Sequence, residues 1–338
     1  MSRRRSAALA AAGAAAAAAV ILLAVTGVLG GGGTIGGHHA PGRASAVAPG
    51  DGPAMPARGA YFGAWVKPPA YTQQGYLSAV TGLQRQIGRR LDIVHVYLQR
   101  WDTFPTRSER AFLHQGSTLL VSWALSDTRA IESGSYNGLI RQRARAIRAI
   151  GKPIFLEWRW EMDRPNLRAQ VGSPADFIAA WKHIRAIFSQ EHADNVAWVW
   201  CPTARGFAGG YASAYYPGDA QVDWICADAY PGRGPYRSFA DIVQPFLDWA
   251  SHHPKPIMIG EYGVPHSYGP LRRAQWLRDA ARTVTSHQQI KALVYFDSDG
   301  AGSVPETRFS LDATALEAFR GIADDRYFNP RGLPVARH

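Results

Sequence analysis

Residues 256–296 read PIMIGEYGVPHSYGPLRRAQWLRDAARTVTSHQQIKALVYF. This stretch opens with a short apolar run, Pro256–Gly260, and closes with another, Ala292–Phe296. Between them, Leu271–Ser286 repeats apolar residues every three or four positions, the period of an amphipathic helix. Because two neighbouring parallel strands need a crossover of about this length, the stretch predicts a strand–helix–strand unit.

The same alternation extends back to about residue 59. Six further apolar runs come first: Tyr61–Val66, Ile93–Leu98, Thr118–Trp123, Pro153–Trp160, Val196–Trp200 and Val222–Ala227. The other helical patterns are Leu77–Ile87, Tyr136–Ile150, Pro174–Ser189, Phe239–Ser251 and Ala313–Ala323. Eight such units in about 270 residues match the number and size of a TIM barrel. An open doubly wound sheet is disfavoured, because no Gly-rich phosphate loop follows the first strand.

We therefore predict an α/β chain with a single (β/α)8 TIM barrel over residues 59–330 and a C-terminal tail at 331–338. The N-terminal residues have the pattern of a targeting segment. Arg3–Arg5 precede an uncharged apolar run, Ala7–Leu29, which predicts a signal peptide or membrane anchor at 1–30.

The apolar run exceeds the usual length for a signal peptide, and about 20 residues suffice to span a bilayer. A cleaved signal and an uncleaved anchor therefore both stay open. Residues 31–58, rich in Gly, Ala, Pro and His, are expected to form a flexible linker. Either alternative predicts an exported barrel, secreted or held at the outer face of the membrane, with membrane contact only through the N-terminal segment.

The chain has a net charge of +11. Residues 1–58 hold five arginines against Asp51, a net charge of +4, which leaves +7 for the remainder. Four arginines between residues 141 and 148 alternate with apolar residues, a pattern typical of the solvated face of an amphipathic helix. Without a recognition motif beside this charge, we expect no nucleic-acid partner.

Cys201 and Cys226 are the two cysteines, and both lie in or beside predicted strands that should be neighbours. Outside the cytoplasm a disulfide is permitted, and two buried free thiols are the alternative. The histidines are scattered and lack ligand spacing with carboxylates. We therefore expect no metal. We also expect no cofactor, and we expect the chain to be a monomer.

Aromatic and acidic residues gather at the predicted carboxyl ends of the strands, where TIM barrels build their active sites. The residues expected to bind substrate there are Trp65, Trp101, Trp123, Arg159, Trp160, Trp200, Asp228, Tyr230 and Phe296. Flat rings offer platforms for sugars, and core packing is the alternative role for each ring.

Two acids stand out at these strand ends. Glu161 follows the fourth apolar run and Glu261 the seventh, so the barrel places them across its mouth from each other. Glycoside cleavage needs such a pair. Strict alternation along the fourth strand would put Glu157, Arg159 and Glu161 on one face. We expect Glu157 and Arg159 to pair beneath Glu161, with a partly solvated twist at the strand end as the alternative.

Several stretches carry a resemblance to a known family. They are Ile131–Asn137 followed by Gly151-Lys152-Pro153; Trp160-Glu161-Met162-Asp163; Val199-Trp200-Cys201-Pro202; Tyr215–Asp219; Val222–Ile225; Asp228-Ala229-Tyr230; and Lys255–Gly263. In this order they resemble glycoside hydrolase family 26, a clan-A family of retaining endo-hydrolases that includes β-mannanases and mixed-linkage glucanases.

The resemblance implies that Glu161 is the acid/base, Glu261 the nucleophile and Tyr230 a tyrosine near the nucleophile. It implies an endo-acting hydrolase of a β-linked polysaccharide, β-mannan or mixed-linkage β-glucan. The family usually has His before the acid/base and Asn-Gly after the Met, where this chain has Trp160 and Asp163-Arg164. These differences leave the glycan open. The alternatives are a non-catalytic polysaccharide-binding barrel and a hydrolase of another clan-A family.

Overall fold

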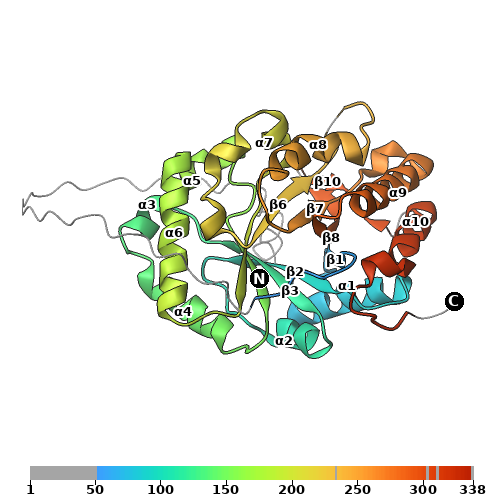
Figure 1. Ribbon diagram of the computed structural model, residues 1–338. Helices are drawn as coiled ribbons and strands as arrows, with labels where there is room; N and C mark the ends of the chain where they lie inside the picture. Colours follow the sequence, from blue (N-terminus) through green and yellow to red (C-terminus); the bar gives the residue numbers. More distant parts are fainter. Residues whose placement is uncertain (1–51, 233, 302–303, 310–311, 336–338) are drawn as a thin grey trace, which may run out of the picture.

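A computed structural model describes residues 52–232, 234–301, 304–309 and 312–335. Eight parallel strands close into a barrel in sequence order, and β8 pairs with β1 (Figure 1). The strands are β1 (Tyr61–Val66), β2 (Ile93–Gln99), β3 (Thr118–Ala124), β4 (Ile154–Trp158), β5 (Val196–Trp200), β6 (Trp224–Ala229), β7 (Ile257–Tyr262) and β8 (Ile290–Asp297). This arrangement confirms the predicted (β/α)8 barrel.

Helices surround the strands on the outside of the barrel (Figure 1). They are α1 (Gln73–Gln86), α2 (Arg107–His114), α3 (Thr128–Glu132), α4 (Asn137–Arg148), α5 (Arg168–Val171), α6 (Pro174–Gln190), α7 (Ala204–Ala208), α8 (Phe239–Ala250), α9 (Pro270–Ser286) and α10 (Ala313–Asp324). A hairpin of β9 (Asp299–Ala301) and β10 (Val304–Glu306) follows β8.

Local sequence explains where these helices begin. At α6, Ser173 and Asp176 form a capping box and Pro174 occupies the first turn, which satisfies amide donors that a helix leaves free at its start. Thr106 and Glu109 form the same motif at α2. The sequence prediction missed α2, because eight residues give too few turns for a clear apolar period.

The core has two layers, separated by the strands. One layer lies inside the barrel and includes Leu120, Val199 and Met258. The other lies between the strands and the helices, and it includes Trp123 and Trp200. Because side chains alternate along a strand, neighbours in sequence enter different layers.

The arginines between residues 141 and 148 lie on α4. Arg141 and Arg145 both form ion pairs with Glu191, and Arg148 donates a hydrogen bond to its backbone oxygen. Arg143 is buried with its guanidinium over the ring of Trp123. These arginines therefore fasten α4 to the end of α6 and to the barrel wall.

Residues near both ends of the described chain contact the barrel. Pro53 and Pro56 are buried, and Tyr61 donates a hydrogen bond to the backbone oxygen of Ala54. Arg331 donates to the Gly116 backbone oxygen and to Thr118. The expected boundaries near residues 58 and 330 therefore fall within segments that touch the barrel.

The predicted signal or anchor at 1–30 lies outside the described residues, and so does most of the predicted linker at 31–58. Among the helices that the structure describes, none combines the length and apolar character needed to cross a membrane.

Candidate active site

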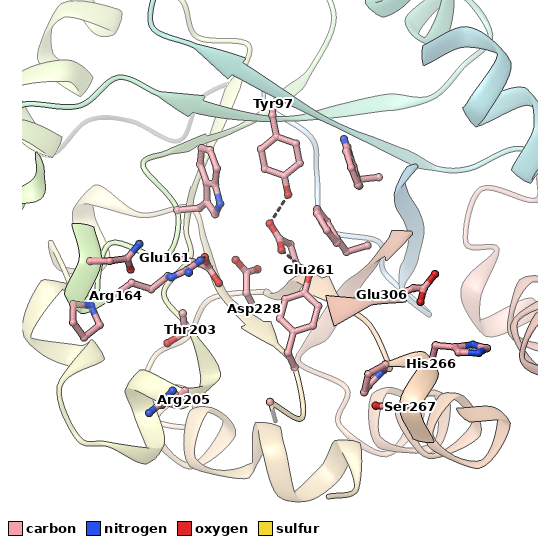
Figure 2. A pocket seen from close by; sticks show the side chains of 18 of the residues that line it. Tyr97, Glu161, Arg164, Thr203, Arg205, Asp228, Glu261, His266, Ser267 and Glu306 are labelled. Atoms are coloured by element: carbon pink, nitrogen blue, oxygen red, sulfur yellow. Dashed lines mark hydrogen bonds and ion pairs between the residues drawn. The ribbon is translucent and has the colours of Figure 1, made fainter. Parts of the chain in front are cut away.

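A cavity of about 1320 Å³ opens where the strands end (Figure 2). Its wall includes side chains from or directly after β1, β2, β4, β6, β7 and β8: Trp65, Tyr97, Glu161, Asp228, Glu261 and Phe296. This is the end of the barrel at which TIM-barrel enzymes place their active sites. Trp65 stacks on Phe296 with 4.4 Å between ring centroids, so part of the wall is an aromatic surface.

The segment that carries Glu161 departs from regular strand geometry. β4 ends at Trp158, and both Arg159 and Glu161 have a φ of 51°. This left-handed conformation is uncommon for residues with a side chain. The Glu161 amide nevertheless donates a 2.7 Å hydrogen bond to the backbone oxygen of Cys201, which holds the turn against β5. Backbone strain of this kind clusters at functional sites.

Glu261 lies on β7 and is buried between two tyrosines. Tyr97 donates a hydrogen bond to its Oε1, and Tyr230 donates one to its Oε2 at 2.7 Å (Figure 2). Burial, and then the charge of Glu161, raise the pKa of Glu261 to about 7, while the two tyrosine hydrogen bonds act in the opposite direction. Both oxygens of this carboxyl are therefore oriented at the floor of the cavity.

A chain of buried polar groups continues from Tyr97 into the barrel. The Tyr97 hydroxyl lies 3.5 Å from Nδ1 of His95, whose Nε2 lies 2.6 Å from the Ser122 hydroxyl. Ser122 in turn donates a hydrogen bond to Glu157. Burial lowers the pKa of His95 to about 3 and raises the pKa of Glu157 well above its usual range. His95 is therefore neutral beneath the nucleophile candidate.

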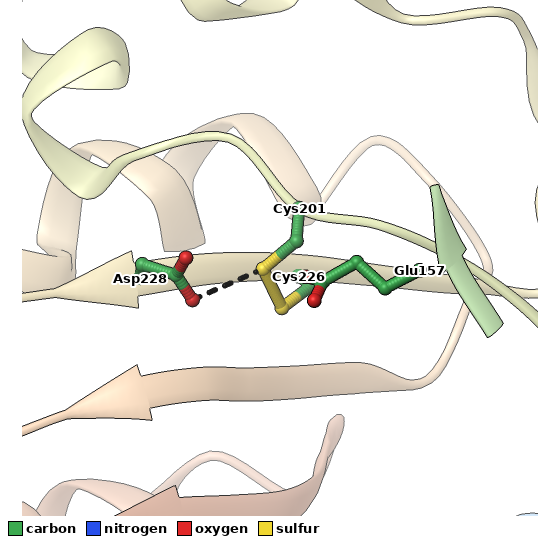
Figure 3. A group of neighbouring side chains, drawn as sticks. All are labelled: Glu157, Cys201, Cys226 and Asp228. Atoms are coloured by element: carbon green, nitrogen blue, oxygen red, sulfur yellow. Dashed lines mark hydrogen bonds between the residues drawn. A yellow bond between two sulfur atoms is a disulfide. The ribbon is translucent and has the colours of Figure 1, made fainter. Parts of the chain in front are cut away.

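A disulfide joins Cys201, just after β5, to Cys226 on β6 (Figure 3). The sulfur of Cys201 lies 3.3 Å from Oδ1 of Asp228, and Glu157 lies beside the pair. A thiolate is the form of cysteine that binds metals, so the oxidised pair offers no metal ligand. Gly260 packs against these groups, and a Cβ there would lie 2.6 Å from the Cys226 sulfur.

The residues after Glu161 connect β4 to β5. Asp163 accepts hydrogen bonds from the Thr203 amide at 3.0 Å and from its hydroxyl at 2.6 Å. Burial raises the pKa of Asp163 to about 6. Arg164 turns back and forms a 2.5 Å ion pair with Oε2 of Glu161. Asp163 and Arg164 stand where family 26 usually has Asn-Gly. Arg164 contacts Glu161, and Asp163 contacts the loop that follows β5.

Seven of the eleven predicted site residues line this cavity. They are Trp65, Trp160, Glu161, Asp228, Tyr230, Glu261 and Phe296. Burial, and then the charge of Glu261, raise the pKa of Asp228 well above its usual range. The structure therefore brings both predicted acids into one space with five of the expected substrate-binding residues.

The other four predicted residues lie elsewhere. Trp123 and Trp200 are fully buried in the layer between strands and helices, because both occupy outward-facing positions on their strands, and they cannot reach a sugar. Trp101 is 70% exposed and lies outside the cavity against Tyr136. Arg159 is buried and donates a hydrogen bond to Gln170.

The expected pair of Glu157 and Arg159 does not form. Glu157 accepts its hydrogen bond from Ser122, while Arg159 turns outward to Gln170. The prediction assumed that alternation continued through Glu161, whereas the strand ends at Trp158 and the backbone twists at Arg159.

The sequence reasoning missed Tyr97, His95 and Ser122. A signal was present, since His95, Tyr97 and Gln99 alternate with apolar residues in β2. Polar side chains repeating every second residue in a buried strand point to one face, here the barrel interior.

No family model matches the sequence. The chain is 27% identical over 291 residues to endoglucanase H of Acetivibrio thermocellus, an alignment that covers 80% of this chain and 31% of the relative. It is 29% identical over 219 residues to the β-1,3-xylanase TXYA of a Vibrio species, covering 56% of this chain and 45% of that one. The chain thus spans less than half the length of these curated relatives.

Among solved structures, the catalytic domain of a GH26 endo-β-1,4-mannanase from Bacillus sp. JAMB-750 matches with a TM-score of 0.62 and 14% identity. The match covers 80% of this chain and 87% of that one. The resemblance to glycoside hydrolase family 26 predicted from the sequence is therefore confirmed, and this chain has the fold of the family 26 β-mannanases.

Proposed function

We propose that this chain is an exported, retaining glycoside hydrolase that cleaves a β-linked polysaccharide at internal bonds. Glu161 is the acid/base and Glu261 the nucleophile. The observation that carries the proposal is that both carboxyls line one cavity at the mouth of the barrel, with aromatic rings beside them. The similarity to an endoglucanase and a β-1,3-xylanase supports a glycan substrate.

The mechanism is a double displacement. Protonated Glu161 gives its proton to the glycosidic oxygen while a Glu261 oxygen attacks the anomeric carbon and the bond to the leaving sugar breaks. Glu161 then takes a proton from water, and the resulting hydroxide equivalent releases the sugar from Glu261. Tyr97 and Tyr230 hold the two oxygens of Glu261 in place before the attack.

Glu261→Ala tests this proposal. We expect hydrolysis to be lost while the fold is kept, because the variant lacks only the attacking carboxylate. Reducing-sugar release from β-mannan, mixed-linkage β-glucan and xylans measures activity, and the anomeric configuration of the first product, followed by proton NMR, measures retention. Undiminished turnover by the variant would exclude Glu261 as the nucleophile. Binding of a glycan by the parent chain without release of product would instead favour a non-catalytic binding barrel.

A further inference from the structure

Two arginines that the structure describes on the cavity wall lie on the same side, next to Glu161. Arg164 pairs with Glu161, and Arg205 lies on α7, directly after β5. Figure 2 shows both arginines on the side of Glu161, with Glu306 and His266 on the far side of Glu261. The arginines described on the cavity wall are therefore gathered beside Glu161, one of the two candidate catalytic acids.

Arg205 is an exposed arginine on the wall of this cavity. Its side chain lines the cavity, and among the residues that the structure describes its guanidinium forms no hydrogen bond or ion pair. Tyr211, 38% exposed, lines the same wall a few residues later. An exposed guanidinium and an accessible ring in the same cavity suit a sugar that carries a negative group.

Arg164 has donors to spare on the same side. One of its terminal nitrogens bonds Oε2 of Glu161, whereas a guanidinium has five N–H donors. The side chain is only partly buried, at 25% exposure. It can therefore reach a ligand in the cavity without being released from a buried site.

The ion pair between Arg164 and Glu161 has a consequence for the first chemical step. An ion pair requires an ionised Glu161, whereas the acid step requires a proton on that carboxyl. A second anion beside Arg164 resolves this conflict, because the guanidinium can exchange Glu161 for the new partner. Glu161 then takes up a proton from solvent and passes it to the glycosidic oxygen as the bond to the leaving sugar breaks.

We propose that the side of the cavity next to Glu161 binds a sugar bearing an anionic substituent, and that Arg164 and Arg205 recognise that substituent. The acid/base protonates the leaving group, so this sugar is the one that leaves. The substrate is thus an acidic polysaccharide, with a uronate carboxylate or a sulfate ester as the recognised group. This inference rests on the proposed function, because it takes the roles of Glu161 and Glu261 from it.

Binding is tested in full-length Glu261→Gln, which is expected to hold substrate without cleaving it. The probes are alginate, glucuronoxylan and xanthan, each compared with a sample whose carboxyl groups have been reduced to alcohols. Carrageenan and its desulfated form make the second arm, which distinguishes sulfate from carboxylate. Affinity electrophoresis measures each dissociation constant. We expect at least one acidic glycan to bind roughly tenfold or more tightly than its neutral counterpart, the effect of one charged hydrogen bond.

Arginine variants locate the effect. Arg164→Gln and Arg205→Gln, each added to Glu261→Gln, are expected to remove most of the preference for the acidic glycan. Arg278→Gln, an exposed arginine on α9 outside the cavity, makes the same charge change and is expected to keep the preference. An equal loss in all three variants, or no preference for any acidic glycan, overturns the inference.

Hydrolysis by the parent chain separates this inference from the proposed function. Cleavage of neutral and acidic glycans at equal rates would contradict the proposed subsite for an anionic sugar but not the proposed hydrolase activity. Binding of an acidic glycan that depends on the arginines, without any product release, would support the proposed binding site and contradict the proposed hydrolase activity. Preferred cleavage of an acidic glycan, lost in Arg205→Gln, supports both.

Discussion

Glu261 is subject to opposing influences that set how it titrates. Burial and the nearby charge of Glu161 raise its pKa to about 7, while hydrogen bonds from Tyr97 and Tyr230 favour the charged form. A nucleophilic carboxyl must be ionised to attack. The two tyrosines therefore keep the carboxylate accessible near neutral pH in a site that would otherwise hold it protonated.

Removing one of these hydrogen bonds should shift the pH dependence of activity. In Tyr97→Phe the Glu261 carboxylate loses a donor, so its pKa rises and the acid limb of kcat/KM moves to higher pH, by roughly one unit for a hydrogen bond to a charged group. Tyr327→Phe, which removes a hydroxyl bonded to the backbone of Val284, is the matched control and should leave the limb in place. An unshifted limb in Tyr97→Phe would mean that this hydroxyl does not influence the titration.

The sequence predicted the two acids and Tyr230 near the nucleophile, but not Tyr97, the other tyrosine that bonds Glu261. Glu161 and Glu261 follow apolar runs at the fourth and seventh positions of a repeated unit, and strand order alone brings such positions together. Tyr97 lies inside a strand, where a tyrosine is as often a packing residue. Its partner, Glu261, is 164 residues away, so no local pattern links them.

At the scale of elements, the eight strands were predictable because each is a short apolar run buried on both faces. The short helices α3, α5 and α7 have four or five residues each, too few for a detectable period. The side of the strand on which an aromatic residue near its end lies was hard to predict. It depends on which residue of the strand begins the alternation between inward and outward side chains. Trp200 shows this, since Val199 and Cys201 face inward on either side of it.

The disulfide between β5 and β6 should stabilise the barrel. It closes a segment of 25 residues, and in the chain-entropy description a loop of this size contributes about 3 kcal/mol by restricting the unfolded chain. We expect the Cys201→Ser, Cys226→Ser double variant to melt several degrees below the parent. A reducing agent should lower the melting temperature of the parent and leave that of the double variant unchanged.

A thiol count provides an independent check on this link. The denatured parent chain, kept free of reductant, should show no reactive thiol. Two reactive thiols under these conditions would show that the cysteines are free. The sequence alone could not decide between the two states, since both place the sulfurs in a buried environment.

At the scale of the whole molecule, closing the barrel concentrates carboxyls in its interior and mouth. Burial raises the pKa of Glu157 and Asp228, and it raises the pKa of Asp163 and Asp297 to about 6 and that of Glu261 to about 7. Each carboxyl binds its proton more tightly in the folded chain than in the unfolded one. Their contribution to stability is therefore complete below about pH 4 and is lost as pH rises through the folded values.

His95 changes the stability with pH in the opposite direction, because burial lowers its pKa to about 3. Its contribution is present above about pH 6.5 and is lost as pH falls. Five buried carboxyls have a raised pKa, whereas one histidine has a lowered pKa. We therefore expect the carboxyls to dominate the change in stability between pH 5 and 8. Replacing one of these carboxyls with its neutral amide should therefore raise the free energy of unfolding, relative to the parent, more at pH 8 than at pH 5.

Glu157→Gln isolates this effect, since Glu157 is fully buried and accepts its hydrogen bond from Ser122. We expect the free energy of unfolding of the variant, relative to the parent, to increase from pH 5 to pH 8, because only the parent must hold a proton in the folded barrel that its unfolded chain releases as pH rises. Urea denaturation at each pH measures the difference. Glu317→Gln removes an acid that is 74% exposed and should give a difference that stays flat. A flat difference for Glu157→Gln as well would mean that Glu157 titrates in the folded barrel as it does in the unfolded chain.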